Sequence, residues 1–230
     1  MKRIGIIGGM SWESTATYYR LLNEGVKKRL GGFHSAECIL YSVDFAEIES
    51  LQRQGRWREM GGKIVEAAEL LRQGGAEGII VCSNTMHEVA DQIIQGCPLP
   101  FLHIAEATAD CIHQADIRKV GLIGTQFTME RETYRGRLWD HRRIETIVPE
   151  REQQNEIHRI IFEELCQGII REESRQCYLK VMQGLVDEGV EGIILGCTEI
   201  NLLVNEEDAN VPIFDTTRIH AEAALEWALK

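Results

Sequence analysis

The chain has 230 residues, of which 44% are hydrophobic and 27% are charged, and its formal net charge is −11. This length can bury a substantial core in one or two domains, whereas no apolar run approaches the roughly 18 residues that span a membrane. The negative charge argues against a general affinity for nucleic acid or anionic membranes. The amino terminus lacks the long apolar core of a signal peptide, so we expect a cytoplasmic globular protein.

Seven cysteines are distributed along the chain without a CxxC pair. An odd number without a compact framework argues against a disulfide scaffold. The seven histidines form no HExxH arrangement near a cysteine pair, so the sequence predicts no zinc site. Most of the thiols are expected to be small buried hydrophobic groups.

Short apolar runs of strand length alternate with longer segments of helical periodicity. In chain order the predicted strands are residues 3–7, 36–43, 78–82, 100–104, 120–123, 193–195 and 211–214. Continuous apolar strands separated by amphipathic helices are typical of parallel sheets that are covered on both faces. We therefore expect an α/β protein built of doubly wound parallel sheets, and we expect the charged segment 142–156 to be an exposed connection.

Two of the predicted helices have a clear apolar face and end at glycines. The first has apolar residues at every fourth position and stops at Gly31: Tyr18, Leu22, Val26 and Leu30. The second stops at Gly74 and carries Ile64, Ala67, Ala68 and Leu71. A glycine directly after the last periodic residue is a common way to end a helix.

An internal repeat runs through the chain. GAEGIIVCSNT (75–85) recurs as GVEGIILGCTE (189–199), RIGIIGG (3–9) as KVGLIGT (119–125), and LPFLHIAEA (99–107) resembles VPIFDTTRI (211–219). Three matches in the same order indicate duplication followed by divergence. The repeat predicts two pseudo-symmetric α/β lobes, residues 1–115 and 116–230, with the active site in the cleft between them and the final helix packed back on the first lobe.

The repeat places two nucleophile-type side chains at equivalent strand ends, Ser83 in the first half and Cys197 in the second. Ligands bind beyond the carboxyl ends of strands in such sheets. Thr85 and Glu88 match a capping box, which predicts a helix start that holds a carboxylate through the N–H groups of Asn84 and Thr85. Thr198 is a second potential cap, and a helix start beside Cys197 would lower the pKa of its thiol.

These residues resemble a known family. SNTMH (83–87), GCTE (196–199) and IGGMSWEST (7–15) are similar to motifs of the aspartate/glutamate racemases, and the resemblance continues to FDTTRIHAEAA (214–224). The related glutamate racemases of cell-wall synthesis usually carry DSG and CTH at two of these places. This chain instead has GGM (8–10) and CTE (197–199). It therefore resembles the branch of the family that acts on aspartate or, more broadly, on dicarboxylate amino acids. The resemblance implies an amino-acid racemase that uses no pyridoxal phosphate or metal and forms a homodimer.

Racemisation needs two acid/base groups on opposite faces of Cα, and most members of the family use two cysteines. This chain has Ser83 where the first cysteine is usual. Cys82 is a poor substitute, because neighbouring residues of a strand face opposite sides. We expect Cys197 to be the thiolate base and Ser83 its partner on the opposite face, with the L-substrate favoured.

A set of polar residues is expected to hold the amino-acid dicarboxylate. Backbone N–H groups at helix starts can stabilise the negative charge of the carbanion-like intermediate of racemisation. Asn84, Thr85 and Thr198 lie at predicted helix starts and are therefore the candidates for this role. The resemblance adds Met10, Gln52, Thr125 and Thr128. Aspartate and glutamate differ by one methylene, worth about 1–3 kcal/mol in a pocket, so the sequence leaves the choice between them open.

Other residues and functions stay open at this point. GIIGGM has Ile7 where a dinucleotide loop needs glycine, which disfavours a nucleotide site. His87 either approaches a substrate carboxylate or lies on the surface of its helix. His220 either lines the site or caps the final helix. Arg53 either pairs with a distal carboxylate of the substrate or is solvated. The alternative functions are another cysteine-dependent isomerase, a hydantoin racemase or decarboxylase, and a catalytically idle carboxylate-binding protein.

Overall fold

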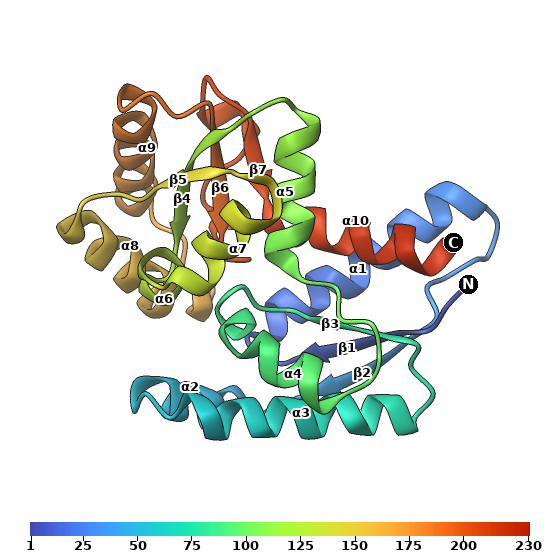
Figure 1. The fold of residues 1–230 in the computed structure, drawn as a ribbon. Coiled ribbons are helices and arrows are strands. Elements are labelled where there is room, and N and C mark those ends of the chain that lie inside the picture. Colours follow the sequence, from blue (N-terminus) through green and yellow to red (C-terminus); the bar gives the residue numbers. More distant parts are fainter. The chain divides into compact units, whose positions relative to one another are not determined.

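The computed structural model describes residues 1–230 and contains two parallel β-sheets, one of three and one of four strands (Figure 1). The chain divides into two compact units. The first unit comprises Met1–His103 and His220–Lys230, and the second comprises Ile104–Ile219. The predicted α/β class with a parallel sheet in each lobe is confirmed.

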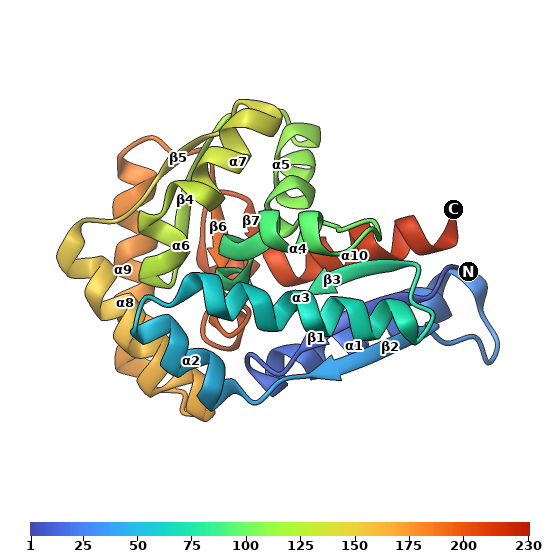
Figure 2. The same cartoon turned by 60° about the horizontal axis from the view of Figure 1, so that its bottom comes forward.

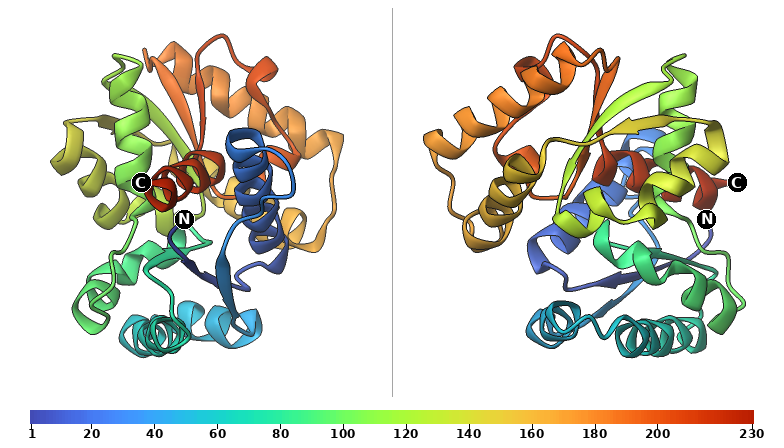
Figure 3. Two further views of the ribbon diagram at one scale, coloured as in Figure 1. Left: turned by 90° about the vertical axis from the view of Figure 1, so that its right-hand side faces the viewer. Right: turned by 60° about the vertical axis from the view of Figure 1, so that its left-hand side comes forward.

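The sheet of the first unit has the order β2-β1-β3, formed by Cys38–Ser42, Ile4–Gly8 and Gly78–Val81. Helix α1 (Trp12–Leu30) covers one face and α3 (Trp57–Gln73) covers the other (Figures 1 and 3). The unit also contains α2 (Phe45–Arg53), the 3₁₀ helix η1 (Thr85–Val89), α4 (Ala90–Gly96) and most of α10 (Thr216–Leu229).

Strand β1 supplies side chains to two separate cores because successive residues of a strand point to opposite faces. Ile4 and Ile6 pack with α1 and α10, whereas Ile7 packs with α2 and α3. A strand that is buried on both faces reads as a continuous apolar run, as this one does.

Helix α1 buries three of its four predicted core positions. Tyr18, Leu22 and Val26 are fully buried, whereas Leu30 is 47% exposed at the end of the helix. Gly31 follows with φ of 69°, a backbone conformation that glycine adopts without steric cost. The predicted glycine stop is confirmed, whereas Leu30, in the last turn of the apolar face, is not part of the core.

The sheet of the second unit has the order β5-β4-β6-β7, formed by Glu145–Ile147, Lys119–Gly124, Gly192–Gly196 and Ile213–Asp215. One face is covered by α5 (Ile104–Gln114) and α7 (Glu132–Arg142), the other by α8 (Arg151–Glu163) and α9 (Glu172–Asp187) (Figure 2). Short elements are α6 (Gln126–Glu130) and the 3₁₀ helices η2 (Leu165–Gln167), η3 (Ile200–Leu202) and η4 (Glu206–Asp208).

Two segments differ from the sequence-based expectation. Residues 142–156 are not only a connection, since they contain β5 and the start of α8. An edge strand is held by backbone hydrogen bonds to one neighbour, so three residues with a charged flank suffice. Conversely, residues 100–104 form no full strand. Phe101 makes a single parallel bridge with Ile79, and α5 begins at Ile104.

The internal repeat has the same strand register in both sheets. Ile4 lies opposite Gly78 in the first sheet, and the repeat-related Val120 lies opposite Gly192 in the second. The same equivalence extends to the third repeated segment. The N–H of Ile79 donates to the carbonyl of Pro100 at 2.8 Å, as the N–H of Ile193 does to Pro212 at 2.9 Å.

The helices that follow this third segment are exchanged between the units. Helix α5 belongs to the first repeat but groups with the second unit, and α10 from His220 onward belongs to the second repeat but groups with the first unit. The compact units therefore differ from the halves 1–115 and 116–230, whose boundaries stay a prediction. None of the helices combines the length and apolar character needed to cross a membrane.

Candidate active site

Ser83 follows the carboxyl end of β3 in the first unit. Its N–H donates to the carbonyl of Val81 at 2.9 Å, which turns the chain directly after the strand. The hydroxyl oxygen accepts a long hydrogen bond of 3.4 Å from the N–H of Met86. Ser83 is partly exposed, whereas Cys82 is fully buried and packs in the core. The expectation that Cys82 faces away from a site at Ser83 agrees with this burial.

The helix start predicted after Ser83 is present, and the capping box of Thr85 and Glu88 stays a prediction. A helix does begin at Thr85, but it is a five-residue 3₁₀ helix without a side-chain cap hydrogen bond from its N-cap residue, Asn84. The hydroxyl oxygen of Ser83, one residue before Asn84, accepts the N–H of Met86 instead. Because so short a helix has a weak dipole, the serine hydroxyl and the local N–H groups matter more here than the helix end.

Met10 lies beyond the carboxyl end of β1, the strand that neighbours β3. The N–H of Cys82 donates to the carbonyl of Ile7 at 2.9 Å, so the two strand ends carrying Met10 and Ser83 are adjacent. Gly9 precedes Met10 with φ of 92°, a conformation that favours glycine. Gln52 lies on α2 of the same unit, and both Met10 and Gln52 are buried.

His87 and His220 are core residues rather than surface or helix-cap groups. Nδ1 of His87 lies 2.8 Å from the carbonyl oxygen of Ser83 and donates to it. His220 accepts from the Tyr18 hydroxyl at Nδ1, at 2.9 Å, and donates from Nε2 to the Leu102 carbonyl at 2.8 Å. The ring centroids of His87 and His220 are 5.6 Å apart. The helical start after β3 thus packs on a buried imidazole of the last helix.

Arg53 has an exposed side chain, with 74% of its surface accessible, and its nearest carboxylate is Glu49 on the same helix at 3.9 Å. The solvated alternative for Arg53 therefore describes the structure better than a binding role.

In the second unit, Cys197 follows the carboxyl end of β6 and contacts a buried carboxylate. Its Sγ lies 3.0 Å from Oε2 of Glu199, to which the thiol donates. The hydroxyl of Thr198 donates to the same oxygen at 2.6 Å. Glu199 is 5% exposed and Thr198 is 8% exposed. Thr198 therefore binds a neighbouring side chain, and it does not cap a helix as the sequence suggested.

The expected lowering of the Cys197 pKa is wrong. Burial raises the pKa well above its usual value, and the negative charge of Glu199 raises it further, followed by the charge of Cys166. The N–H of Glu199 hydrogen-bonds the sulfur and acts in the opposite direction but is outweighed. The helix after Cys197 is only the three residues Ile200–Leu202, too short to supply the positive end on which the expectation rested.

Thr125 and Thr128 lie at the end of β4, the strand that pairs with β6. The Thr125 hydroxyl oxygen accepts from the N–H of Thr128 at 3.3 Å, and the two hydroxyl oxygens are 3.2 Å apart. Gly124 pairs with Gly196, and a Cβ on Gly124 would lie only 2.9 Å from the Gly196 carbonyl oxygen. Glycine there permits the close approach of the strand ends that carry Thr125 and Cys197.

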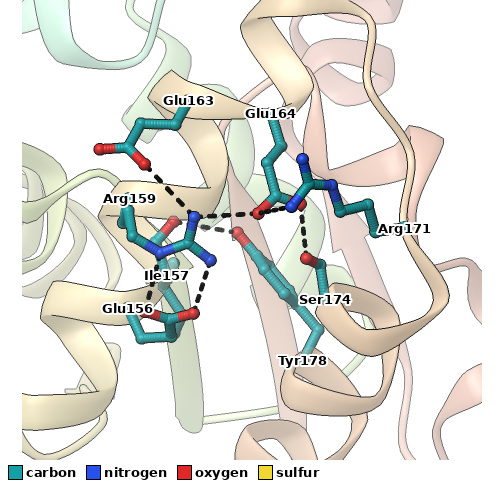
Figure 4. A network of polar contacts seen from close by, with 8 residues as sticks. All are labelled: Glu156, Ile157, Arg159, Glu163, Glu164, Arg171, Ser174 and Tyr178. Atoms are coloured by element: carbon teal, nitrogen blue, oxygen red, sulfur yellow. Dashed lines mark hydrogen bonds and ion pairs between the residues drawn. The ribbon is translucent and has the colours of Figure 1, made fainter.

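A polar network joins the end of α8 to α9, and η2, which contains Cys166, directly follows Glu164 of this network (Figure 4). Glu164 is 2% exposed, accepts from the Ser174 hydroxyl at 2.5 Å and pairs with Arg159 at 3.0 Å and Arg171 at 4.0 Å. Burial acts to raise the pKa of Glu164, but the Ser174 hydrogen bond and the Arg159 charge outweigh it, so the pKa lies below its ordinary value. The network fixes the end of α8 against α9.

The second unit also has an open cavity of about 430 Å³. Its lining contains none of the predicted site residues: Leu195, Asn201, Val204, Asn205, Glu206, Glu207, Ile213, Asp215 and Arg218. The structure thus forms two strand-end clusters, one with Ser83 and Met10 and one with Cys197, Thr198 and Thr125. Sequence reasoning missed Glu199 as a partner of Cys197, although its place two residues after the cysteine was an available signal.

Comparison with known proteins identifies the family. The Asp/Glu/Hydantoin racemase model matches residues 7–224. The crystal structure of a candidate Asp/Glu racemase from Yersinia pestis is 56% identical, with a TM-score of 0.94, and that of an aspartate racemase homologue from Pyrococcus horikoshii OT3 is 35% identical, with a TM-score of 0.87. Both cover 100% of each chain. The broad specificity amino-acid racemase RacX of Bacillus subtilis (strain 168) is 23% identical over 235 residues, 96% of each chain. The chain therefore belongs to the Asp/Glu/hydantoin racemase family and is an amino-acid racemase of that family.

Proposed function

We propose that the protein interconverts the L- and D-forms of aspartate or glutamate by proton transfer at Cα, with Cys197 as the base and Ser83 as the partner on the opposite face. The observation that carries this assignment is the Cys197 thiol at the end of β6, 3.0 Å from the Glu199 carboxylate, in a chain of the racemase family. The aspartate racemase homologue that is 35% identical over the whole chain supports the dicarboxylate substrate.

The chemistry follows from the two strand ends. The Cys197 thiolate takes the proton from Cα, so that an S–H bond forms, the Cα–H bond breaks and the electron pair spreads into the substrate carboxylate. Ser83 then gives its hydroxyl proton to the other face of Cα. The Met86 N–H that donates to the Ser83 oxygen supports the negative charge which this step leaves there.

The substrate carboxylates are assigned to the hydroxyl and N–H groups near these two side chains. In the first unit these are Asn84 and Thr85, next to Ser83, and Met10 and Gln52 are assigned to positions near the substrate. In the second unit they are the hydroxyls of Thr125 and Thr128 and the backbone N–H of Thr198, whose own hydroxyl donates to Glu199.

The two faces of Cα are not chemically equivalent in this assignment. A thiolate is a far stronger base at neutral pH than an unactivated serine hydroxyl, and the α-proton of the L-substrate is assigned to the thiol side. Because two enantiomers have equal free energy in water, kcat/KM for complete interconversion must be equal in both directions. The asymmetry therefore shows in the exchange of the α-proton with solvent, and we expect it to favour the L-form.

Proton NMR in heavy water tests the assignment. With the wild-type protein, L-aspartate or L-glutamate should lose its α-proton signal quickly with retained configuration, while the D-form exchanges more slowly and the D-enantiomer accumulates. Cys197→Ser should abolish the exchange. Persistent exchange in this variant, or equal exchange of both enantiomers, contradicts the assignment, and binding without exchange in the wild type would instead favour a carboxylate-binding protein.

Three further parts belong to the proposal. The family resemblance implies that the reaction uses no pyridoxal phosphate or metal and that the protein is a homodimer. The third part, action in the cytoplasm, is the expectation from the sequence. Activity that is unchanged by chelator and by hydroxylamine, which traps pyridoxal phosphate, is expected. Analytical ultracentrifugation should give the mass of two chains of 26.1 kDa each.

A further inference from the structure

The backbone around Ser83 is hydrogen-bonded on both sides of its Cα. On the amino side, the carbonyl of Cys82 accepts from the Ser14 hydroxyl at 3.1 Å. In the same peptide group, the N–H of Ser83 donates to the carbonyl of Val81 at 2.9 Å. On the carboxyl side, the carbonyl of Ser83 accepts from Nδ1 of His87 at 2.8 Å. Because a peptide group is planar and leaves two soft dihedral angles per residue, these contacts fix the direction of the Cα–Cβ bond of Ser83.

The two side-chain donors are buried, whereas the Ser83 side chain is partly exposed. Ser14 is 3% exposed and His87 is 1% exposed, so water does not readily replace them as donors. The Ser83 hydroxyl oxygen accepts a long hydrogen bond of 3.4 Å from the N–H of Met86. Because the hydroxyl accepts in this bond, its own proton stays available to an acceptor.

Helix α1 supports both donors. Ser14 and Tyr18 are four residues apart on this helix and therefore lie on the same face. The Tyr18 hydroxyl donates to Nδ1 of His220 at 2.9 Å, and the ring of His220 packs against the ring of His87 with centroids 5.6 Å apart. One face of α1 thus holds the peptide before Ser83 directly and supports His87 through a buried imidazole.

We propose that Ser14 and His87 are positioning residues, which aim the Ser83 hydroxyl at its face of the substrate by fixing the peptide planes on both sides of Ser83. This role rests on the racemase function proposed above. A serine hydroxyl is a weak acid, so the transfer of its proton to Cα requires close alignment with the reacting carbon. Displacement of a catalytic group by about 1 Å can lower a rate about 100-fold. Ser14 and His87 neither take nor give a proton in this role.

Ser14→Ala tests the role through the ratio of two rates. Conversion of L- to D-aspartate needs Ser83, whereas exchange of the α-proton of L-aspartate with retained configuration needs Cys197 alone. We expect conversion to fall at least about tenfold in Ser14→Ala, while exchange stays within about twofold of the wild type. Loss of folded protein would lower both rates equally. Ser174→Ala removes a buried serine hydroxyl from the second unit, and this matched control should keep the wild-type ratio.

Two replacements of His87 test the carboxyl side of Ser83 in the same assay. His87→Leu should lower the ratio of conversion to exchange at least about tenfold. His87→Asn keeps a donor for the Ser83 carbonyl and should restore most of the wild-type ratio. A wild-type ratio in either Ser14→Ala or His87→Leu overturns the proposal, and so does an equal fall of both rates.

Deuterium uptake of the peptide that contains residues 82–87 tests the contacts around Ser83 without any substrate. In Ser14→Ala the N–H groups of Ser83 and Met86 should exchange at least about tenfold faster than in the wild type, because local opening becomes easier. The amides of the second sheet should keep their wild-type rates. Unchanged uptake in Ser14→Ala contradicts the proposal whether or not the protein is active. Faster uptake in a protein that exchanges no α-proton would uphold the role of Ser14 and contradict the racemase function alone.

Discussion

Nδ1 of His87 lies 2.8 Å from the carbonyl oxygen of Ser83, and the His87 ring is almost fully buried. Since a carbonyl only accepts, Nδ1 carries the hydrogen, and the ring is assigned to this tautomer by its partner. This bond fixes the backbone of Ser83 at the point where its side chain leaves the strand. The ring also contacts His103 and His220, with centroids 4.7 Å and 5.6 Å away.

Replacing His87 should therefore destabilise the first unit. In His87→Leu the Ser83 carbonyl loses its buried donor, which costs about 1–3 kcal/mol in the free energy of unfolding. His87→Asn, whose amide can donate from a similar position, should recover most of this loss. Urea unfolding measures both variants. Equal stability of His87→Leu and wild type would show that the hydrogen bond does not hold this segment.

The pKa of His220 gives a specific dependence of stability on pH. Burial lowers this pKa to about 4, against an opposing hydrogen bond from Nε2 to Leu102. The unfolded chain, with a pKa near 6.5, then binds more protons than the folded protein between about pH 4 and 6.5. The contribution of His220 to the free energy of unfolding is therefore fully present above about pH 6.5. It is lost as the pH falls from about 6.5 to about 4, by about 3 kcal/mol in total.

This dependence can be isolated by comparing unfolding free energies from pH 7 to pH 4 in two variants. His220→Gln should lose the contribution, and its stability should fall less steeply with acid than that of the wild type. His34→Gln, at an exposed histidine, is the matched control and should retain the wild-type slope. The same acid slope in His220→Gln and His34→Gln would contradict the assignment.

Ser83→Cys should make the two faces of the substrate more alike. A cysteine at this strand end is a few per cent thiolate near pH 7 and intrinsically nucleophilic, so α-proton exchange of the D-substrate should increase about 100-fold or more. Exchange of the L-substrate should change much less. Cys82→Ala is the control, because Cys82 is buried in the core; a large loss of exchange in Cys82→Ala would mean that the wrong residue has been assigned.

Glu164 should contribute to stability through its buried hydrogen bond and ion pair. Glu164→Leu leaves the Ser174 hydroxyl without its acceptor and removes the buried carboxylate that pairs with Arg159, which keeps Glu156 and Glu163 as partners. We expect a loss of about 1–3 kcal/mol in the free energy of unfolding. Arg171, 57% exposed and 4.0 Å from Glu164, should matter little, since exposed ion pairs contribute at most about 1 kcal/mol. A larger loss in Arg171→Ala than in Glu164→Leu would reverse this assignment.

Periodicity and repetition in the chain were sufficient to predict the central strands of both sheets and the strand ends that carry Ser83 and Cys197, but not every strand. The apolar strands 78–82 and 193–195 lie where the structure has β3 and β6, because a strand buried on both faces has few alternatives to an apolar run. Strand β5 was missed because Glu145 and Thr146 at a sheet edge need backbone partners only. The short 3₁₀ helices after β3 and β6 were mistaken for α-helix starts, because a cap motif does not specify how far a helix continues.

The sequence by itself determined the family, the two parallel sheets and the equivalence of Ser83 with Cys197, since these depend on local pattern and on the repeat. Only the tertiary structure decided the electrostatics around Cys197. Its pKa is raised rather than lowered, because desolvation and the Glu199 charge depend on distances and burial that no local pattern encodes. The exchange of α5 and α10 between the units likewise depends on the tertiary structure, because it follows from the apolar faces that come into contact in the folded chain.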